Sequence, residues 1–177
     1  MNQNNVKTSD RSSKIILLGE DDIDDQEFLK EALASFNNSY ALDFENNGRK
    51  VVTHLEGLSN DSLPCLIILD YNLPELNAEE ILKTLNAHKR YDPIPIIVWS
   101  TSNSSLYKSK CINLGASDYL VKPRNMASFV ETAEHMFSFA TFHNVITNNS
   151  SYITLLVLRK SKIPFNFHFI ELHPPPG

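Results

Sequence analysis

Short apolar runs alternate with segments of helical periodicity five times along this 177-residue chain. Each apolar run is short enough for one strand, and the segments between the runs place Leu, Ile, Val and Phe at helical spacing. The predicted strands are residues 15–18, 40–45, 66–69, 94–99 and 119–121. The predicted helices are residues 24–36, 51–58, 81–85, 106–114 and 126–137. Strict alternation of this kind predicts an α/β fold, a five-stranded parallel sheet with helices on both faces.

Local signals mark several ends of these elements. Asp24, with Glu27 three residues later, has the pattern of a helix N-cap with a capping box. The sequence Asn46-Asn47-Gly48 is typical of a turn after the second strand. We expect Gly115 to end the fourth helix, because glycine commonly follows the last helical residue.

The bulk composition argues against several classes of protein. The net charge is −5 and the Lys and Arg residues are scattered, whereas a nucleic-acid-binding surface is usually basic. The polar start lacks the apolar segment of a secretory signal, and no stretch approaches the roughly 18 apolar residues of a membrane span. Cys65 and Cys111 have the surroundings of buried thiols, which suits a reducing compartment. We therefore expect a cytoplasmic protein that binds neither nucleic acid nor membranes.

Charged and hydroxyl side chains follow four of the predicted strands. In a parallel sheet the carboxyl ends of the strands meet at one edge, and sites form there at the point where the strand order reverses. We therefore expect these side chains to gather at one place. They are Glu20, Asp21 and Asp22 after the first strand, Asp70 after the third, Ser100 after the fourth and Lys122 after the fifth.

Asp70 is the candidate nucleophile at this edge. Carboxylates packed together repel one another, and Mg²⁺, which prefers oxygen ligands, is the simplest compensating ion. A carboxylate beside Mg²⁺ can accept a phosphoryl group. Lys122 would then pair with one phosphoryl oxygen and Ser100 would donate a hydrogen bond to another, which is most of what phosphoryl transfer requires.

The acidic run after the first strand leaves two ligand pairs open. Glu20 with Asp21 is favoured by the strand register, and Asp21 with Asp22 is the alternative. The acidic run DDIDD, residues 21–25, also has a structural interpretation, as a solvated first helical turn that is stabilised by the helix dipole. Asp70 likewise has one, as a turn former after its strand.

Four short motifs carry a family resemblance. They are Glu20-Asp21, Asp70-x-Asn72-x-Pro74, Ser100-Thr101 and Gly115-Ala116-x-x-Tyr119-x-x-Lys122-Pro123. Over about residues 14–140 this pattern resembles the receiver domain of bacterial response regulators. The stretch ILLGEDDIDDQEFLKEAL is similar to small stand-alone receivers that pair with phytochrome-type or hybrid histidine kinases. The resemblance implies a flavodoxin-like sheet with strand order 2-1-3-4-5.

The resemblance also implies a chemical role for each residue near Asp70. Asp70 would accept a phosphoryl group from the phosphohistidine of a sensor histidine kinase. Asp21 would bind Mg²⁺ directly and Glu20 would bind it through water, while Asp70 and the backbone carbonyl of Asn72 supply further oxygens. The chain would then be a phosphoacceptor signalling protein that assists its own phosphorylation and dephosphorylation, rather than an enzyme with an external substrate.

Ser100, Lys122 and Tyr119 would convert phosphorylation into a signal. Ser100 and Lys122 would contact the phosphoryl group, which adds roughly −1.5 to −2 charge. Tyr119 matches the aromatic switch position of the family, and its ring would enter the space that Ser100 vacates. The surface of the last two helices and the last strand would change as a result. The resemblance also implies a cis peptide between Lys122 and Pro123.

The chain is predicted to have three segments. Residues 1–13 are expected to be disordered, residues 14–142 form the receiver and residues 143–177 form a C-terminal extension. The runs 152–158 and 165–169 can pair as a hairpin, whose apolar side chains need cover from the receiver or from a second copy in a homodimer. The extension is too short for a typical output domain, so we expect output through binding of a downstream protein.

Three other interpretations compete with this one. A Mg²⁺-dependent phosphotransferase of the haloacid-dehalogenase kind needs a second Asp where this chain has Asn72. A flavin-binding module needs a phosphate-binding loop after the first strand, where Glu20 and Asp21 would repel phosphate. A receiver fold that only binds partners would never be phosphorylated, and the complete set of residues argues against it. A phosphate sink would be phosphorylated but would have no output of its own.

Overall fold

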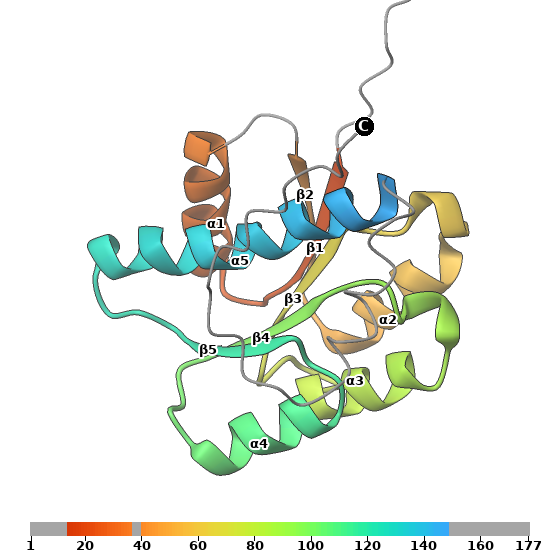
Figure 1. The fold of residues 1–177 in the computed structure, drawn as a ribbon. Helices are drawn as coiled ribbons and strands as arrows, with labels where there is room; N and C mark the ends of the chain where they lie inside the picture. Colours follow the sequence, from red (N-terminus) through yellow and green to blue (C-terminus); the bar gives the residue numbers. More distant parts are fainter. Residues whose placement is uncertain (1–13, 37–39, 149–177) are drawn as a thin grey trace, which may run out of the picture. The chain divides into compact units, whose positions relative to one another are not determined.

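A five-stranded parallel sheet forms the centre of the molecule. The computed structural model describes residues 14–36 and 40–148. The strand order is β2-β1-β3-β4-β5, with α1 and α5 on one face and α2, α3 and α4 on the other (Figure 1). The predicted fold class and strand order are therefore confirmed.

The strands and helices alternate along the whole described chain. The strands are β1 (Lys14–Gly19), β2 (Tyr40–Glu45), β3 (Leu66–Asp70), β4 (Ile96–Ser100) and β5 (Asp118–Val121). The α-helices are α1 (Ile23–Phe36), α2 (Gly48–Gly57), α3 (Ala78–Asn86), α4 (Ser105–Asn113) and α5 (Met126–Asn148). Two short 3₁₀ helices, Asn60–Ser62 and Lys89–Tyr91, precede β3 and β4.

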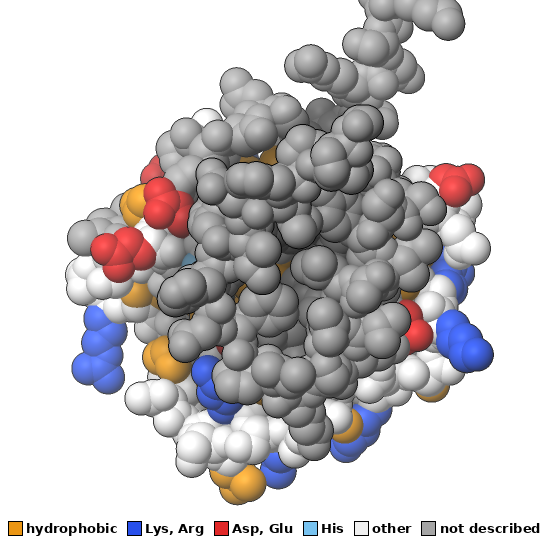
Figure 2. All heavy atoms as spheres, in the orientation of Figure 1, with side chains coloured by type: hydrophobic (Ala, Val, Ile, Leu, Met, Phe, Trp, Pro, Cys, Tyr) orange, Lys and Arg blue, Asp and Glu red, His pale blue; other side chains and the backbone are white. Residues whose placement is uncertain are grey.

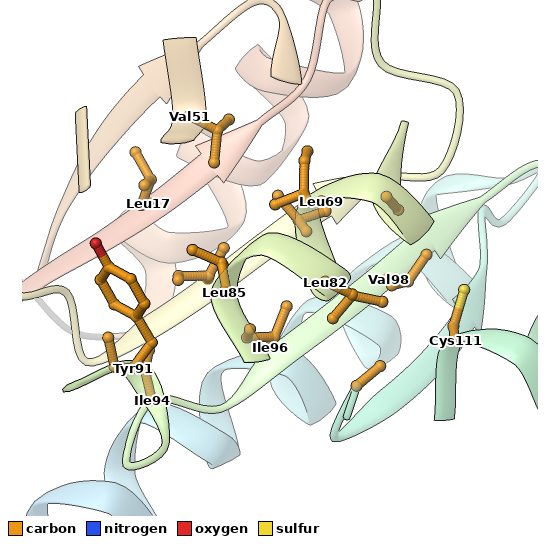
Figure 3. Close-up of a cluster of buried hydrophobic side chains, with 14 of the residues drawn as sticks. Leu17, Val51, Leu69, Leu82, Leu85, Tyr91, Ile94, Ile96, Val98 and Cys111 are labelled. Carbon is orange, nitrogen blue, oxygen red and sulfur yellow. The ribbon is translucent and has the colours of Figure 1, made fainter. Parts of the chain in front are cut away.

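The core consists of two layers, because successive side chains of a strand point to opposite faces of the sheet. Every residue of β3 and β4 is buried, as expected for central strands that are covered on both faces. On one face the even-numbered residues of β3 pack with α1 and α5, and on the other the odd-numbered residues pack with α2, α3 and α4. Figure 3 shows part of the second layer, where Leu82 and Leu85 of α3 lie over the sheet.

Several helices begin at polar caps that apolar spacing alone did not reveal. Asn47 caps α2 by accepting a hydrogen bond from the N–H of Lys50 at 2.8 Å. A capping box formed by Asn77 and Glu80 begins α3. Gly115 follows α4 with φ of +100°, which confirms its predicted role at the helix end.

Several predicted element starts are wrong, and α2 and α3 each begin three residues earlier than predicted. Asp22, not Asp24, accepts hydrogen bonds from the first turn of α1, so the predicted capping box of Asp24 and Glu27 is not formed. The helix starts earlier because Asp22 is the last non-helical residue before Ile23. The fourth strand begins at Ile96 rather than at residue 94, since Pro95 has no N–H to donate to a sheet ladder.

The chain divides into two compact units, Met1–Asn144 and Val145–Gly177. The first contains the sheet and the helices up to most of α5, and this helix continues past residue 142 to Asn148. The predicted disorder of residues 1–13 and the predicted hairpin of residues 152–169 lie outside the described residues, so both stay predictions.

The surface of the first unit carries charges of both signs. On the face drawn in Figure 2, the described Lys and Arg side chains lie mainly toward the bottom and the sides, and most of the described Asp and Glu side chains lie toward the upper left and upper right. No helix within residues 14–36 and 40–148 combines the length and apolar character that crossing a membrane requires.

Gly48 fixes the start of α2 against the loop that follows β3. Its N–H donates to the carbonyl of Pro74 at 3.0 Å, and a Cβ at this position would overlap the backbone carbonyl of Leu76. Only glycine allows this close approach of two backbones. The contact therefore ties α2 to the loop that leaves Asp70.

We expect Gly48→Ala to lower the free energy of unfolding by about 2 kcal/mol or more, because the added methyl overlaps backbone atoms that cannot rotate away. Gly57→Ala in the same helix is the matched control. A Cβ there meets no atom within 4 Å, so the variant should gain up to about 1 kcal/mol from helix propensity. Urea unfolding followed by circular dichroism measures both changes. Similar effects at the two glycines would contradict this account.

Candidate functional site

The polar residues predicted from the strand ends do come together at one edge of the sheet. Asp70 is the last residue of β3 and Ser100 the last of β4. Glu20 directly follows β1, and Lys122 directly follows β5. Asp70, Ser100 and Glu20 are buried, which is unusual for such polar side chains. The switch point lies here, because β1 pairs with both β2 and β3.

Asp70 is held by one contact at each carboxylate oxygen. Its Oδ2 accepts a hydrogen bond from the N–H of Asn72 at 2.6 Å. Its Oδ1 lies 2.8 Å from Nζ of Lys122. The backbone beyond it is also fixed, because the N–H of Tyr71 donates to the carbonyl of Trp99 at 3.0 Å. The carboxylate is therefore oriented but not fully enclosed, since 8% of its side chain remains exposed.

Lys122 is surrounded by three carboxylates. Besides its ion pair with Asp70, its ammonium donates to Glu20 at 2.7 Å and to Asp25 at 2.8 Å. The ammonium also lies 4.9 Å from the centre of the Trp99 ring, a cation–π distance. Burial by itself would lower the pKa of Lys122, but the hydrogen bonds that its ammonium donates to Asp25, Asp70 and Glu20 outweigh burial and raise the pKa above its ordinary value. The lysine is thus a fixed positive charge at this edge.

Glu20 is the most buried carboxylate of the group. Burial raises its pKa from the ordinary 4.5 to about 7, although its hydrogen bond with Lys122 acts in the opposite direction. The charge of Asp70 contributes to this rise. One ammonium therefore does not compensate all the negative charge that the fold collects here.

The carboxylates fit a hard divalent cation. Oxygens of Glu20, Asp21 and Asp70 lie within 4.8 Å of one another, and oxygen donors are the ligands that Mg²⁺ takes in proteins. The carboxylate of Asp22 instead caps α1 by accepting a hydrogen bond from the N–H of Asp24. The arrangement therefore favours Glu20 and Asp21 as the pair of metal ligands over Asp21 and Asp22. Asn72 lies two residues beyond Asp70, in the loop that follows β3.

Ser100 ends β4, and Tyr119 is the second residue of the neighbouring strand β5. The hydroxyl oxygen of Ser100 accepts a hydrogen bond from the N–H of Ser102 at 3.1 Å, and the Tyr119 hydroxyl donates to the carbonyl of Ser102 at 2.9 Å. The Tyr119 ring is buried, with 3% of the residue exposed. The movement of this ring toward the space beside Ser100 stays a prediction.

A ladder of tyrosine rings extends from Tyr119 toward α4. The ring of Tyr71 packs edge-on to Tyr119 with centroids 6.3 Å apart, and it stacks on Tyr107 of α4 at 4.7 Å. Because Tyr71 directly follows Asp70, these rings connect the phosphoacceptor candidate to α4 through continuous packing.

Two features differ from the sequence-based expectation. The Lys122–Pro123 bond is not cis, since the described residues contain no cis peptide bond, and the trans form is the lower-energy isomer before proline by about 0.5–1 kcal/mol. Asp25 was interpreted only as part of a solvated helical turn, yet it contacts Lys122. No local signal marks this contact, because the partners are 97 residues apart.

A model of the response regulator receiver domain matches residues 16–134. This chain belongs to the response regulator receiver family. Among curated relatives, the two-component response regulator ORR3 of Oryza sativa is 30% identical over 118 residues, which cover 67% of this chain and 86% of ORR3. ORR1 of the same plant is 41% identical over 58 residues, which cover 33% of this chain and 25% of ORR1. The matched part of this chain thus spans only about a quarter of the length of ORR1.

Solved structures of receivers have the same fold. The Mn(2+)-bound form of the response regulator Rcp1 is 28% identical, with a TM-score of 0.64 over 71% of this chain and 93% of that one. The phosphorylated cyanobacterial phytochrome response regulator RcpA is 26% identical, with a TM-score of 0.67 over 73% of this chain and 95% of that one.

The pKa of Glu20 predicts how the metal-free receiver responds to pH. Below about pH 4.5 Glu20 is protonated in both the folded and unfolded states, and its stabilising contribution is complete. As the pH rises toward 8, Glu20 ionises at a lower pH in the unfolded chain than in the folded protein. Its contribution to the free energy of unfolding, up to about 3 kcal/mol, is therefore lost. Glutamine does not ionise, so Glu20→Gln should not lose stability in this way. Its stability relative to wild type should therefore rise between pH 5 and pH 8.

Thermal unfolding with a chelator present measures the difference between the two proteins at each pH. Glu56→Gln, an exposed position on α2, is the control and should follow wild type. Mg²⁺ should restore wild-type stability at pH 8 and have a smaller effect on Glu20→Gln. Parallel pH curves for wild type and Glu20→Gln would contradict the assignment.

Proposed function

We propose that this receiver accepts a phosphoryl group on Asp70 from a histidine kinase and passes the signal on by binding a downstream protein. The single observation that carries the proposal is the position of Asp70 at the end of β3, with Lys122 2.8 Å away and two further carboxylates beside it. Family membership supports the same role, because receivers belong to two-component signalling systems.

In the proposed reaction an oxygen of Asp70 forms a bond to phosphorus. The phosphorus–nitrogen bond of the phosphohistidine breaks at the same time, and the imidazole leaves with the electron pair of that bond. Lys122 stabilises negative charge on the phosphoryl oxygens, and the hydroxyl of Ser100 donates a hydrogen bond to one of them. Catalysis of this kind consists mainly of positioning and charge stabilisation.

Mg²⁺ is the cofactor in this proposal. Glu20, Asp21 and Asp70, together with the backbone carbonyl of Asn72, would hold it, and the ion would neutralise charge on the phosphoryl oxygens. The raised pKa of Glu20 supports the assignment, because a buried carboxylate that is hard to ionise gains most from a nearby cation.

The proposed output surface lies over α4, β5 and α5. Because the Tyr119 ring is already buried, a change at Ser100 would reach α4 by adjusting the contacts of Tyr119, Tyr71 and Tyr107 rather than by a large rotation of Tyr119. The same surface carries large apolar side chains that are exposed to solvent, which suits protein binding. They are Leu106, Ile112, Val121 and Val130.

The proposed partners follow from this surface and from the relatives. We propose a sensor histidine kinase of the phytochrome or hybrid type as the donor, on the basis of the likeness to the phytochrome response regulator RcpA. A downstream protein or a second copy of the chain would bind the output surface. The two buried free thiols, Cys65 and Cys111, support a reducing, cytoplasmic location.

Phosphorylation with acetyl phosphate and Mg²⁺ tests the assignment of Asp70. Intact-mass spectrometry should show one phosphoryl group on wild type and none on Asp70→Asn, which keeps the shape but loses the nucleophile. Asp61→Asn, at an exposed position before β3, is the matched control and should be phosphorylated like wild type. Trp99 fluorescence should change with phosphorylation in wild type only, because the ring contacts Lys122. Phosphate on Asp70→Asn at the wild-type level would disprove the proposal.

A further inference from the structure

Lys122 has one more anionic partner than the proposed reaction uses. Oδ2 of Asp25, in the first turn of α1, lies 2.8 Å from the ammonium, as near as Oδ1 of Asp70. An ammonium has three N–H donors, and Glu20 is the third carboxylate at this range. A phosphoryl group on Asp70 would bring more oxygens and more negative charge, so it would compete with the other two carboxylates for the same ammonium.

Of the three carboxylates, Asp25 can leave Lys122 at the lowest cost in free energy. Its side chain is 24% exposed, so a released carboxylate regains water. The side chain of Glu20 is 1% exposed, so water could not replace the hydrogen bond that its carboxylate would lose on leaving Lys122. Lys122 itself is held from another direction by the ring of Trp99. Competition for the ammonium should therefore displace Asp25.

We infer that Asp25 is a positioning residue, which occupies Lys122 until Asp70 is phosphorylated and then releases it. The inference rests on the proposed phosphorylation of Asp70 and adds a residue outside the predicted site. Two consequences follow from the geometry. Asp25 lowers the affinity of the site for a phosphoryl group, and its release frees the first turn of α1 from the end of β5.

Beryllofluoride, a tetrahedral mimic of the phosphoryl group, tests the competition at equilibrium. It is titrated with saturating Mg²⁺ into wild type, Asp25→Asn and Asp24→Asn, and binding is followed by calorimetry and by Trp99 fluorescence. Asp25→Asn should bind about fivefold more tightly than wild type, the upper end for a partly exposed ion pair. Asp24→Asn removes an equal charge from the same helical turn without touching the pair, so its affinity should equal that of wild type.

Amide hydrogen exchange measures the second consequence. Beryllofluoride should increase exchange in the first turn of α1 in wild type and in Asp24→Asn, whereas Asp25→Asn should exchange faster before beryllofluoride is added. If Asp25→Asn is unfolded by circular dichroism, Asp25→Ser replaces it, because serine also suits a first helical turn.

The outcomes separate this inference from the proposed function. Wild type that binds beryllofluoride, together with equal or weaker binding by Asp25→Asn, would overturn the role of Asp25 and leave the proposed function intact. Wild type that neither binds beryllofluoride nor takes phosphate from acetyl phosphate would overturn the proposed function and this inference with it.

Discussion

The ammonium of Lys122 is the contact on which the rest of the site depends. It joins the end of β5 to Glu20 after β1, to Asp25 in α1 and to Asp70 at the end of β3. Carboxylates that leave water for a partly buried site are stable only when a cation or hydrogen-bond donors compensate them. Without this ammonium the fold would bring three acids together with no internal cation between them, so the lysine makes the acidic edge compatible with a folded protein.

The sheet explains why the chemistry lies at this edge. Its central strands are buried on both faces, so β3 and β4 carry only apolar residues until their last positions, Asp70 and Ser100. A polar side chain anywhere earlier in these strands would face one of the two apolar layers. Reactive groups are therefore confined to the strand ends, and parallel strands place those ends together.

The sequence predicted the order of elements well because both of its signals are local. Apolar runs identify the strands, and helical spacing identifies the helices that cover them. Element ends were less predictable, since Asp22 and Asp24 are equally good caps by residue type. Backbone geometry decides between them: the helix starts at Ile23, and Asp22 is the residue in position to accept its free amides.

The sequence by itself determined the parallel sheet, the edge at which the polar residues gather, and membership of the receiver family, because all three depend on residue type and spacing along the chain. Only the tertiary structure decided how the charges at that edge are shared. Asp25 reaches Lys122, and Tyr119 lies inward against Tyr71. Contacts of this kind depend on how α1 and β5 pack across the sheet, and no periodicity in the sequence encodes the distance between residues that far apart.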